Sequence, residues 1–126
     1  MKIYLFDIDG TLTPARQPMS KDFTEFFINF CDENKVYLCT GSDWEKVQEQ
    51  VPPEVLNKCQ GIFTCSGNEY WNRRTEEDVY SLVWDTTFNP PPELIADLNL
   101  FLESSDCPVK TSKHIEERSG MINFSV

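Results

Sequence analysis

Three short apolar runs alternate with two helical patterns over the first half of this 126-residue chain. The runs KIYLFDI, VYLCT and GIFTCS, at residues 2–8, 36–40 and 61–66, have the length of buried strands. Residues 20–35 and 42–50 lie between them and have the apolar spacing of amphipathic helices. Strands separated by helices at this spacing pair in parallel through right-handed crossovers. We therefore expect an α/β fold with a parallel sheet, whose ligands gather beyond the carboxyl ends of its strands.

Local signals indicate where each helix begins and ends. Ser20 is the expected N-cap of the first helix. Ser42, followed three residues later by Glu45, matches a capping box and predicts the start of the second helix. Pro52 and Pro53 are expected to end that helix, because proline lacks the amide hydrogen that a helix interior needs. Residues at spacings of three and four form the apolar face of the first helix: Phe23, Phe26, Phe27, Phe30 and Cys31.

The pattern changes after the third apolar run. The segments EYW and VYSLVW, at 69–71 and 79–84, predict a hairpin with a long loop. A helix is expected over 92–104, where prolines precede apolar residues on one face. The final segment HIEERSGMINFSV predicts two strands about a serine–glycine turn at 119–120. Because a helix followed by antiparallel strands differs from the preceding architecture, we place a domain boundary near residue 88.

The charge of the chain limits its partners. Its 21 acids and 11 bases give a net charge of −10, which repels nucleic-acid backbones and anionic membrane surfaces. No run approaches the roughly 20 apolar residues that cross a membrane, and acids interrupt the first apolar run before a signal peptide could be completed. The five cysteines are scattered, so neither a disulfide framework nor a zinc site is indicated. We expect a cytoplasmic protein that binds a small ligand or a metal ion, with no nucleic acid and no membrane as partner.

Two aspartates follow the first apolar run in the segment FDIDGTLTP. Asp7 and Asp9 are expected at the carboxyl end of the first strand, where alternation lets both carboxylates project to the same side. Carboxylates this close repel each other unless a cation lies between them or one is protonated. Mg²⁺ suits such a pair, since it takes one or two carboxylates together with phosphate and water oxygens. One carboxylate can then attack phosphorus while the other moves protons, and Gly10 permits a tight backbone beside the substrate. The alternative is an acidic turn at a strand end.

Three motifs resemble those of one enzyme superfamily. FDIDGTLTPARQ, at residues 6–17, resembles the first motif of the haloacid-dehalogenase-like (HAD) phosphotransferases, and its PARQ extension looks like that of the eukaryotic-type phosphomannomutases. TGSDWEKVQEQ, at 40–50, is similar to their second motif region, and IEERSGMINFSV, at 115–126, to their cap segment. The resemblance implies a Rossmann-like HAD core at residues 1–88, followed by the beginning of an α+β cap at 89–126.

The resemblance also implies roles for individual residues. Asp7 would be the nucleophile that becomes an aspartyl phosphate, and Asp9 the general acid/base. Mg²⁺ would bind the Asp7 carboxylate and the backbone carbonyl of Asp9. The implied substrate is a hexose phosphate, with the phosphate moved between mannose 1-phosphate and mannose 6-phosphate. Contacts to the substrate and its phosphate would come from Gly10, Arg16, Thr40, Gly41, Ser42, Arg118 and Asn123.

Some of these positions have a second interpretation. Thr40 and Ser42 both follow a strand and precede a helix, whose first backbone amides bind anions. Ser42 is about equally well explained as a helix cap. For Thr40 the second interpretation is an ordinary packed strand residue, and it is weaker than phosphate binding. Arg118 is expected to grip a phosphate with its guanidinium fork; otherwise it is a surface arginine paired with Glu116 or Glu117.

The family pattern has further parts that these residues do not supply. A lysine, a later pair of aspartates and two more cap arginines are expected beyond residue 126. The chain is therefore expected to be either a fragment of a protein about twice as long or a natural short form, and to form a homo-oligomer or pair with a complementing chain. Three functions follow as alternatives: a phosphomannomutase-like phosphotransferase, a sugar-phosphate phosphatase, and a non-catalytic remnant that binds phosphosugar or a partner chain.

Overall fold

The chain forms two compact units, Met1–Asp85 and Thr86–Val126, each with its own sheet. The computed structural model describes four stretches of the chain: residues 2–73, 80–86, 88–108 and 113–125. Within those stretches, no helix has both the length and the apolar character needed to cross a membrane.

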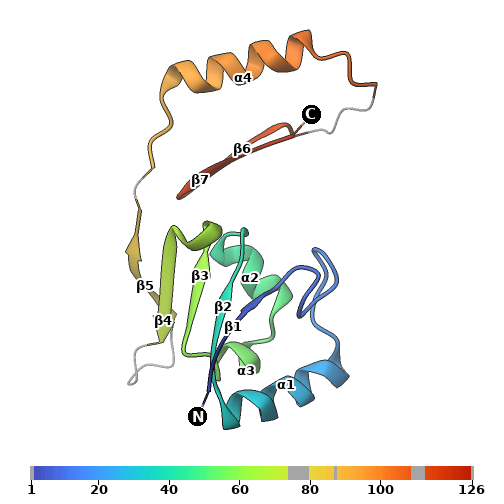
Figure 1. Cartoon of the computed structure of the whole chain (residues 1–126), viewed down its shortest axis with the longest axis vertical. Helices are drawn as coiled ribbons and strands as arrows, with labels where there is room; N and C mark the ends of the chain where they lie inside the picture. Colours follow the sequence, from blue (N-terminus) through green and yellow to red (C-terminus); the bar gives the residue numbers. More distant parts are fainter. Residues whose placement is uncertain (1, 74–79, 87, 109–112, 126) are drawn as a thin grey trace. The chain divides into compact units, whose positions relative to one another are not determined.

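The first unit is built on a five-stranded sheet whose strands follow one another in chain order (Figure 1). The strands are β1 (Ile3–Asp7), β2 (Lys35–Cys39), β3 (Gly61–Thr64), β4 (Glu69–Arg73) and β5 (Tyr80–Asp85). β1, β2 and β3 pair in parallel, which confirms the expected α/β arrangement. β4 runs antiparallel to both of its neighbours, so the predicted hairpin forms the fourth and fifth strands of the same sheet.

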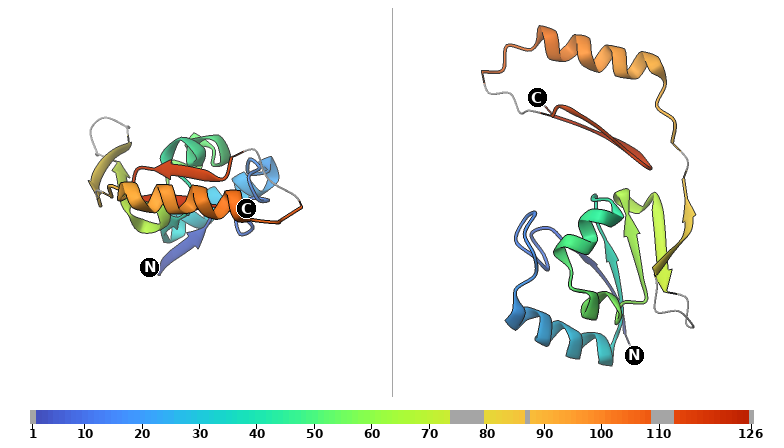
Figure 2. Two further views of the ribbon diagram at one scale, coloured as in Figure 1. Left: turned by 90° about the horizontal axis from the view of Figure 1, so that it is seen from above. Right: turned by 180° about the vertical axis from the view of Figure 1, so that it is seen from behind.

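Three helices connect the parallel strands (Figures 1 and 2). They are α1 (Lys21–Glu33), α2 (Trp44–Gln50) and the single turn α3 (Pro53–Leu56). The sequence predicted α1 and α2 but not α3. Pro53 was expected only to end the preceding helix, whereas it also begins a new one, because proline is tolerated in the first turn.

The helix caps agree with the prediction at one position and differ at the other. Ser20 caps α1 as predicted, its hydroxyl accepting a hydrogen bond from the Phe23 amide at 3.4 Å. Asp43 caps α2, its carboxylate accepting from the Lys46 amide at 2.9 Å. The prediction that Ser42 caps this helix was therefore wrong by one residue, because aspartate caps a helix as well as serine does and directly follows it.

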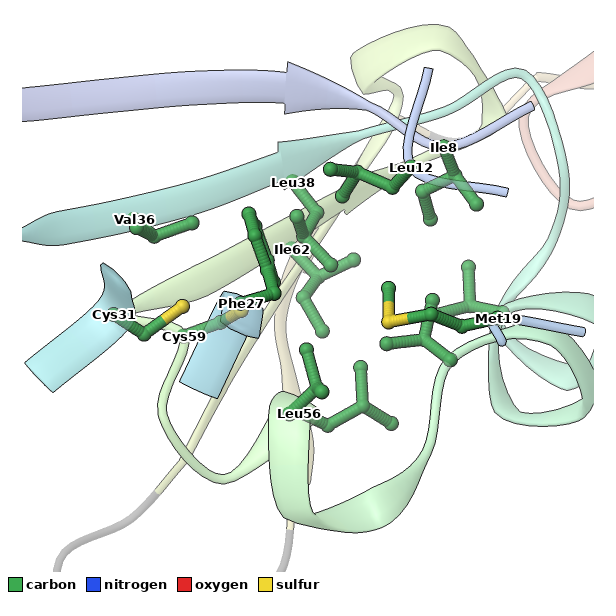
Figure 3. Close-up of a cluster of buried hydrophobic side chains, with 13 residues drawn as sticks. Ile8, Leu12, Met19, Phe27, Cys31, Val36, Leu38, Leu56, Cys59 and Ile62 are labelled. Carbon is green, nitrogen blue, oxygen red and sulfur yellow. The ribbon is translucent and has the colours of Figure 1, made fainter. Parts of the chain in front are cut away.

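The core of the first unit lies between the helices and one face of the sheet (Figure 3). Phe6 of β1 packs edge-on against Phe27 of α1, with ring centroids 5.5 Å apart. Trp44 of α2 stacks on Trp71 of β4 at 4.8 Å. Strands and helices thus bury their apolar sides against each other. The buried hydrophobic residues of this cluster are Ile8, Leu12, Met19, Phe27, Cys31, Val36, Leu38, Val47, Val51, Val55, Leu56, Cys59 and Ile62.

The opposite face of the sheet, here called the open face, is also apolar. Strand pairing places Phe63 of β3 beside Tyr70 of β4, and Tyr70 beside Trp84 of β5, with ring centroids 4.7 and 6.3 Å apart. Gly61 leaves room for the Tyr70 ring, which a side chain at that position would meet. The large apolar side chains of the open face are Ile3, Leu5, Tyr37, Phe63, Tyr70 and Trp84.

The second unit consists of a helix and a hairpin. α4 (Pro92–Ser104) starts after a run of prolines, and β6 (Ile115–Arg118) pairs antiparallel with β7 (Met121–Phe124), as predicted. Phe101 of α4 packs edge-on against Phe124 of β7 at 5.9 Å. The hairpin therefore turns its Phe124 side to the helix. Because neighbours along a strand alternate, the other side carries Glu116, Arg118 and Asn123.

Candidate active site

Asp7 is the last residue of β1, at the carboxyl end of the parallel strands. Its side chain is exposed, and among the described residues its only hydrogen bond is a long one from the Thr11 hydroxyl, at 3.5 Å. Strand pairing places it beside Cys39. Burial raises the pKa of the Cys39 thiol, and the negative charge of Asp7 raises that pKa further. The Asp7 carboxylate is thus open to a ligand and stands next to a thiol that stays protonated at neutral pH.

A tight loop follows β1. The Ile8 carbonyl accepts hydrogen bonds from the backbone amides of Thr11, Leu12 and Thr13 at 3.2, 2.9 and 3.0 Å. Gly10 has a φ of +75°, a conformation that residues with a Cβ adopt only with strain. Its amide donates to the Thr13 carbonyl at 2.7 Å, which closes the loop. The close backbone turn expected at Gly10 is therefore present.

Asp9 lies in this loop and is held by two donors. Its Oδ1 accepts one hydrogen bond from the Arg16 amide and one from Gln50 Nε2, both at 2.7 Å. These two bonds, the Arg16 one first, lower the pKa of Asp9 below its ordinary value of 3.8. Because β1 ends at Asp7, strand alternation does not reach Asp9, and hydrogen bonds set the direction of its side chain instead. The Arg16 side chain itself is exposed.

Gln50 is a site residue that sequence reasoning did not single out. It is the last residue of α2 and is only 1% exposed. Its side chain also donates weakly to the Gln17 carbonyl at 3.4 Å, and the backbone carbonyl of Gln50 accepts from the Met19 amide at 2.8 Å. Gln50 thus ties the loop after β1 to the end of α2. A signal was present in the sequence, since Gln50 shares a helix face with the apolar residue Val47 and so places an amide on a buried face.

The loop after β2 carries three predicted site residues. The Thr40 hydroxyl is buried and accepts a hydrogen bond from the Ser42 amide at 3.1 Å. The carbonyls of Thr40 and Ser42 accept from the amides of Ser66 and Cys65, each at 2.9 Å. Gly41 lies between them and is exposed. The loops after β2 and β3 are therefore fastened to each other at the carboxyl edge of the sheet.

Backbone strain is concentrated in the loop after β3. Cys65, Ser66 and Gly67 have φ values of 48°, 58° and 89°, which place three successive residues in the left-handed region. Non-glycine residues hold this conformation only where the surroundings enforce it, and such strain is frequent at ligand sites. Here the two hydrogen bonds to the loop after β2 enforce it. Sequence analysis did not predict this strain, because of these three residues only Gly67 favours the left-handed region.

Arg118 and Asn123 come together in the second unit. Arg118 Nη2 donates to Glu116 Oε2 at 2.8 Å, and Asn123 Nδ2 donates to the same oxygen at 3.4 Å. Lys113 Nζ lies 3.7 Å from Glu116 Oε1. The Arg118 bond, followed by that of Asn123, lowers the pKa of Glu116. Two bases and an amide thus surround one carboxylate, an arrangement in which an incoming anion competes with Glu116 for Arg118.

The structure therefore groups the predicted residues in two places. Asp7, Asp9 and Gly10 lie at the carboxyl end of β1, and Thr40, Gly41 and Ser42 follow the neighbouring end of β2. Arg118 and Asn123 lie on one side of the hairpin of the second unit. Carboxylate and hydroxyl groups at the end of parallel strands suit a phosphorylated ligand that brings a metal ion with it.

The surroundings of Asp7 fit a magnesium ion with few protein ligands. The described residues hold no cluster of three or more acidic, histidine or cysteine side chains of the kind that encloses a metal. Mg²⁺ does not require one, since it keeps several waters and binds through one or two carboxylates and substrate phosphates. The sparsely bonded carboxylate of Asp7 is available for this purpose, whereas an oxygen of the Asp9 carboxylate is already engaged.

Comparison with known proteins identifies the family. A family model described as eukaryotic phosphomannomutase matches residues 23–126, which is most of the chain. The chain belongs to the eukaryotic phosphomannomutase family. The resemblance inferred from the three motifs is thereby confirmed.

Curated phosphomannomutases match nearly the whole chain. That of Galdieria sulphuraria is 31% identical over 121 residues, which cover 96% of this chain and 48% of the relative. Phosphomannomutase 1 of Mus musculus is 32% identical over 130 residues, covering 96% and 47% respectively. That of Saccharomyces cerevisiae is 30% identical over 126 residues, covering 98% and 48%. The chain thus spans about half the length of the phosphomannomutases that it matches.

Solved structures share the fold. A phosphatase of the haloalkanoate (HAD) superfamily from Bacteroides thetaiotaomicron aligns with a TM-score of 0.52 and 19% identity, covering 82% of this chain and 35% of that one. An IMP-nucleotidase from Plasmodium falciparum aligns with a TM-score of 0.59 and 11% identity, covering 96% and 37%. These matches confirm that this phosphomannomutase-family chain has an α/β fold of the HAD type.

Proposed function

We propose that this chain carries the nucleophilic half of a Mg²⁺-dependent phosphotransferase that acts on hexose phosphates and interconverts mannose 1-phosphate and mannose 6-phosphate through an aspartyl phosphate on Asp7. The observation that supports it best is the contrast between two neighbouring carboxylates. That of Asp7 is exposed and almost without hydrogen bonds, as a nucleophile requires, whereas that of Asp9 is fixed by the Arg16 amide and Gln50.

Each carboxylate has one role in this proposal. Asp7 attacks phosphorus, so that a new O–P bond forms as the bond between phosphorus and the sugar oxygen breaks. Asp9 begins the cycle ionised, takes the proton of the sugar hydroxyl that attacks the aspartyl phosphate on Asp7, and returns that proton to the sugar oxygen that departs when Asp7 is next phosphorylated. The lowered pKa of Asp9 favours its ionised form, which is the form that accepts a proton. Gln50 and the Arg16 amide would keep that carboxylate in place through both steps.

The remaining groups would bind the phosphate and the metal. The Asp7 carboxylate and the Asp9 carbonyl would hold Mg²⁺, which when bound neutralises phosphate charge. Thr40 can donate its hydroxyl hydrogen to the phosphoryl group, because its oxygen already accepts from the Ser42 amide. The Ser42 hydroxyl is available for the same contact with the phosphoryl group, because Asp43 and not Ser42 caps α2. Arg118 and Asn123 would bind the phosphate at the far end of the sugar.

The decisive experiment compares three aspartate variants with the unchanged chain. Asp7→Asn should abolish phosphoryl transfer from α-mannose 1-phosphate, because a neutral amide neither attacks phosphorus nor binds Mg²⁺ well. Asp9→Asn should keep the binding of beryllofluoride, which imitates an acyl phosphate, while losing turnover. Asp32→Asn, at an exposed acid paired with Lys58, is the matched control and should change nothing.

The products decide between the alternatives. Mannose 6-phosphate formed in the presence of a hexose bisphosphate indicates a mutase, and free phosphate indicates a phosphatase. A fully active Asp7→Asn protein, or beryllofluoride attached to another residue, would refute the proposed nucleophile.

A further inference from the structure

Two cysteines meet inside the first unit although they lie far apart in the sequence. Cys31 is on α1, and Cys59 follows α3. Their side chains are 6% and 5% exposed, and both belong to the hydrophobic cluster. Figure 3 shows the two sulfur atoms side by side, and the thiols share a hydrogen bond. A disulfide requires two cysteine side chains that approach each other in this way.

The backbone around this pair is held in place. The Cys59 amide donates to the Leu56 carbonyl at 3.0 Å, and the Cys59 carbonyl accepts from the Tyr80 hydroxyl at 3.1 Å. The sequence neighbours of the two cysteines, Asp32 and Lys58, form an ion pair in which Lys58 Nζ lies 2.5 Å from Asp32 Oδ1. This ion pair joins α1 to the segment after α3 beside the two thiols, so a bond between the sulfur atoms needs little movement of the chain.

The two thiols differ in reactivity. Cys59 donates the shared hydrogen bond, which lowers the pKa of the Cys31 thiol below its ordinary value of 9.0. The same bond, followed by burial, raises the pKa of Cys59. Because the thiolate is the nucleophilic form of cysteine, Cys31 reacts first with an oxidant, and Cys59 is the thiol beside it that resolves the product.

We propose that Cys31 and Cys59 form a reversible disulfide when the protein meets hydrogen peroxide. The Cys31 sulfur attacks one peroxide oxygen, so that an S–O bond forms as the O–O bond breaks, and the other oxygen leaves as water with the thiol proton. The Cys59 sulfur then attacks the Cys31 sulfur, an S–S bond forms, and the hydroxyl group leaves as water with the Cys59 proton. The two thiols together lose two electrons, and one peroxide molecule becomes two water molecules.

The disulfide is separate from the candidate active site and does not depend on the proposed function. β3 begins at Gly61, just after Cys59, whereas Asp7 lies where the parallel strand β1 ends, at the opposite edge of the sheet. The bond closes the chain between residues 31 and 59, a segment that contains β2, α2 and α3. Closing a segment in this way restricts the unfolded chain and so stabilises the folded one.

The test treats the whole chain with hydrogen peroxide. It is done in a Cys107→Ala background, because Cys107 is an exposed thiol and would otherwise join two molecules. Intact-mass spectrometry should show the loss of two hydrogen atoms, which dithiothreitol reverses. Digestion without reductant should yield a peptide pair that links Cys31 to Cys59. The thermal midpoint of the oxidised form should rise by roughly 5–15 °C, as followed by circular dichroism.

Substitutions separate this bond from other oxidation. Cys31→Ala and Cys59→Ala should each abolish the loss of two hydrogen atoms; alanine is used because a serine hydroxyl would be buried in the apolar cluster. Cys65→Ala is the matched control, since Cys65 is also buried, and it should keep the bond. The peptide map of the unsubstituted pair decides the question even if an alanine variant does not fold.

Three results would overturn the proposal. The first is an unchanged mass, or added oxygen without a cross-link, after peroxide treatment. The second is a linkage between any other two cysteines. The third is a thermal midpoint that stays the same or falls on oxidation, which would show that the bond does not stabilise the fold.

Discussion

At the scale of single residues, hydrogen bonds from the Arg16 amide and Gln50 keep the Asp9 carboxylate ionised. Its pKa lies below 3.8 in the folded chain, so the ionised carboxylate stabilises the fold above that pH. This contribution is lost as the pH falls through the folded pKa, since protonation removes the acceptor that Gln50 and the Arg16 amide share. Acid should therefore loosen the loop after β1 by releasing it from the end of α2.

We predict that Gln50→Leu raises the pKa of Asp9 toward 3.8. The leucine keeps the buried volume but removes the Nε2 donor, which is one of the two bonds that lower this pKa. A carbon-detected NMR titration of the Asp9 carboxyl measures the change. Gln48→Leu is the control, because Gln48 is exposed and, among the residues that the structure describes, its side chain donates to the Trp44 carbonyl alone. Equal titration curves for the two variants would mean that Gln50 does not set the charge of Asp9.

Arg118 provides a second prediction, for substrate affinity. Replacing it with alanine removes a charged donor worth about 1.5–3 kcal/mol, so Arg118→Ala should weaken phosphosugar binding by roughly ten- to a hundredfold. Glu116→Gln should act in the opposite direction, because it removes the carboxylate that now holds Arg118. Calorimetry with mannose 1-phosphate measures both. Unchanged affinity in Arg118→Ala would leave this arginine as a surface partner of Glu116.

At the scale of elements, two adjacent residues at the start of α2 have different expected roles: Asp43 caps the helix, and Ser42 is proposed to bind the ligand. Asp43→Ala should lower the free energy of unfolding by about 1 kcal/mol, within a range of about 0.5–2 kcal/mol, because it removes the hydrogen bond to the Lys46 amide. Ser42→Ala should have a smaller effect, since its side chain does not cap the helix. Urea denaturation followed by circular dichroism measures both variants. A larger loss in Ser42→Ala would reinstate serine as the cap.

The elements also show what a sequence can and cannot predict. β1, β2, β3 and α1 were predictable because apolar periodicity and the Ser20 cap act within a few residues. Which of Ser42 and Asp43 caps α2 was not predictable, since the two are adjacent and both residue types cap helices well. The strained loop after β3 and the bond between Gln50 and Asp9 depend on chain segments that meet only after folding. The position of Asp7 at the end of β1 was predictable, whereas the hydrogen bond from Gln50 to Asp9 was not.

At the scale of the whole molecule, burial is concentrated in the first unit. All thirteen residues of the hydrophobic cluster precede residue 63, and no residue of α4 is buried. A domain boundary near residue 88, as proposed, therefore leaves nearly all of the hydrophobic core in the N-terminal piece. The second unit holds together through a helix and a hairpin whose apolar residues stay partly exposed.

We predict that residues 1–88 fold without the rest of the chain. Their thermal midpoint should lie within about 5 °C of that of the full chain, because removing residues 89–126 takes away little buried apolar surface. Residues 89–126 alone should show only partial helicity and no cooperative transition. Circular dichroism melting curves of the two pieces provide the measurement. A midpoint that falls by 15 °C or more in the shorter piece would place part of the stabilising core in the second unit.

The order of the strands has a consequence for how the chain is made. Because β1 to β5 lie in the sheet in the order in which they occur in the chain, each strand can pair with the one synthesised just before it. Pairing of successive elements keeps sequence separation small, and domains generally form from the N-terminal end during synthesis. The sheet can therefore grow strand by strand on the ribosome, with the candidate nucleophile in place at the end of its first strand before the last one has been translated.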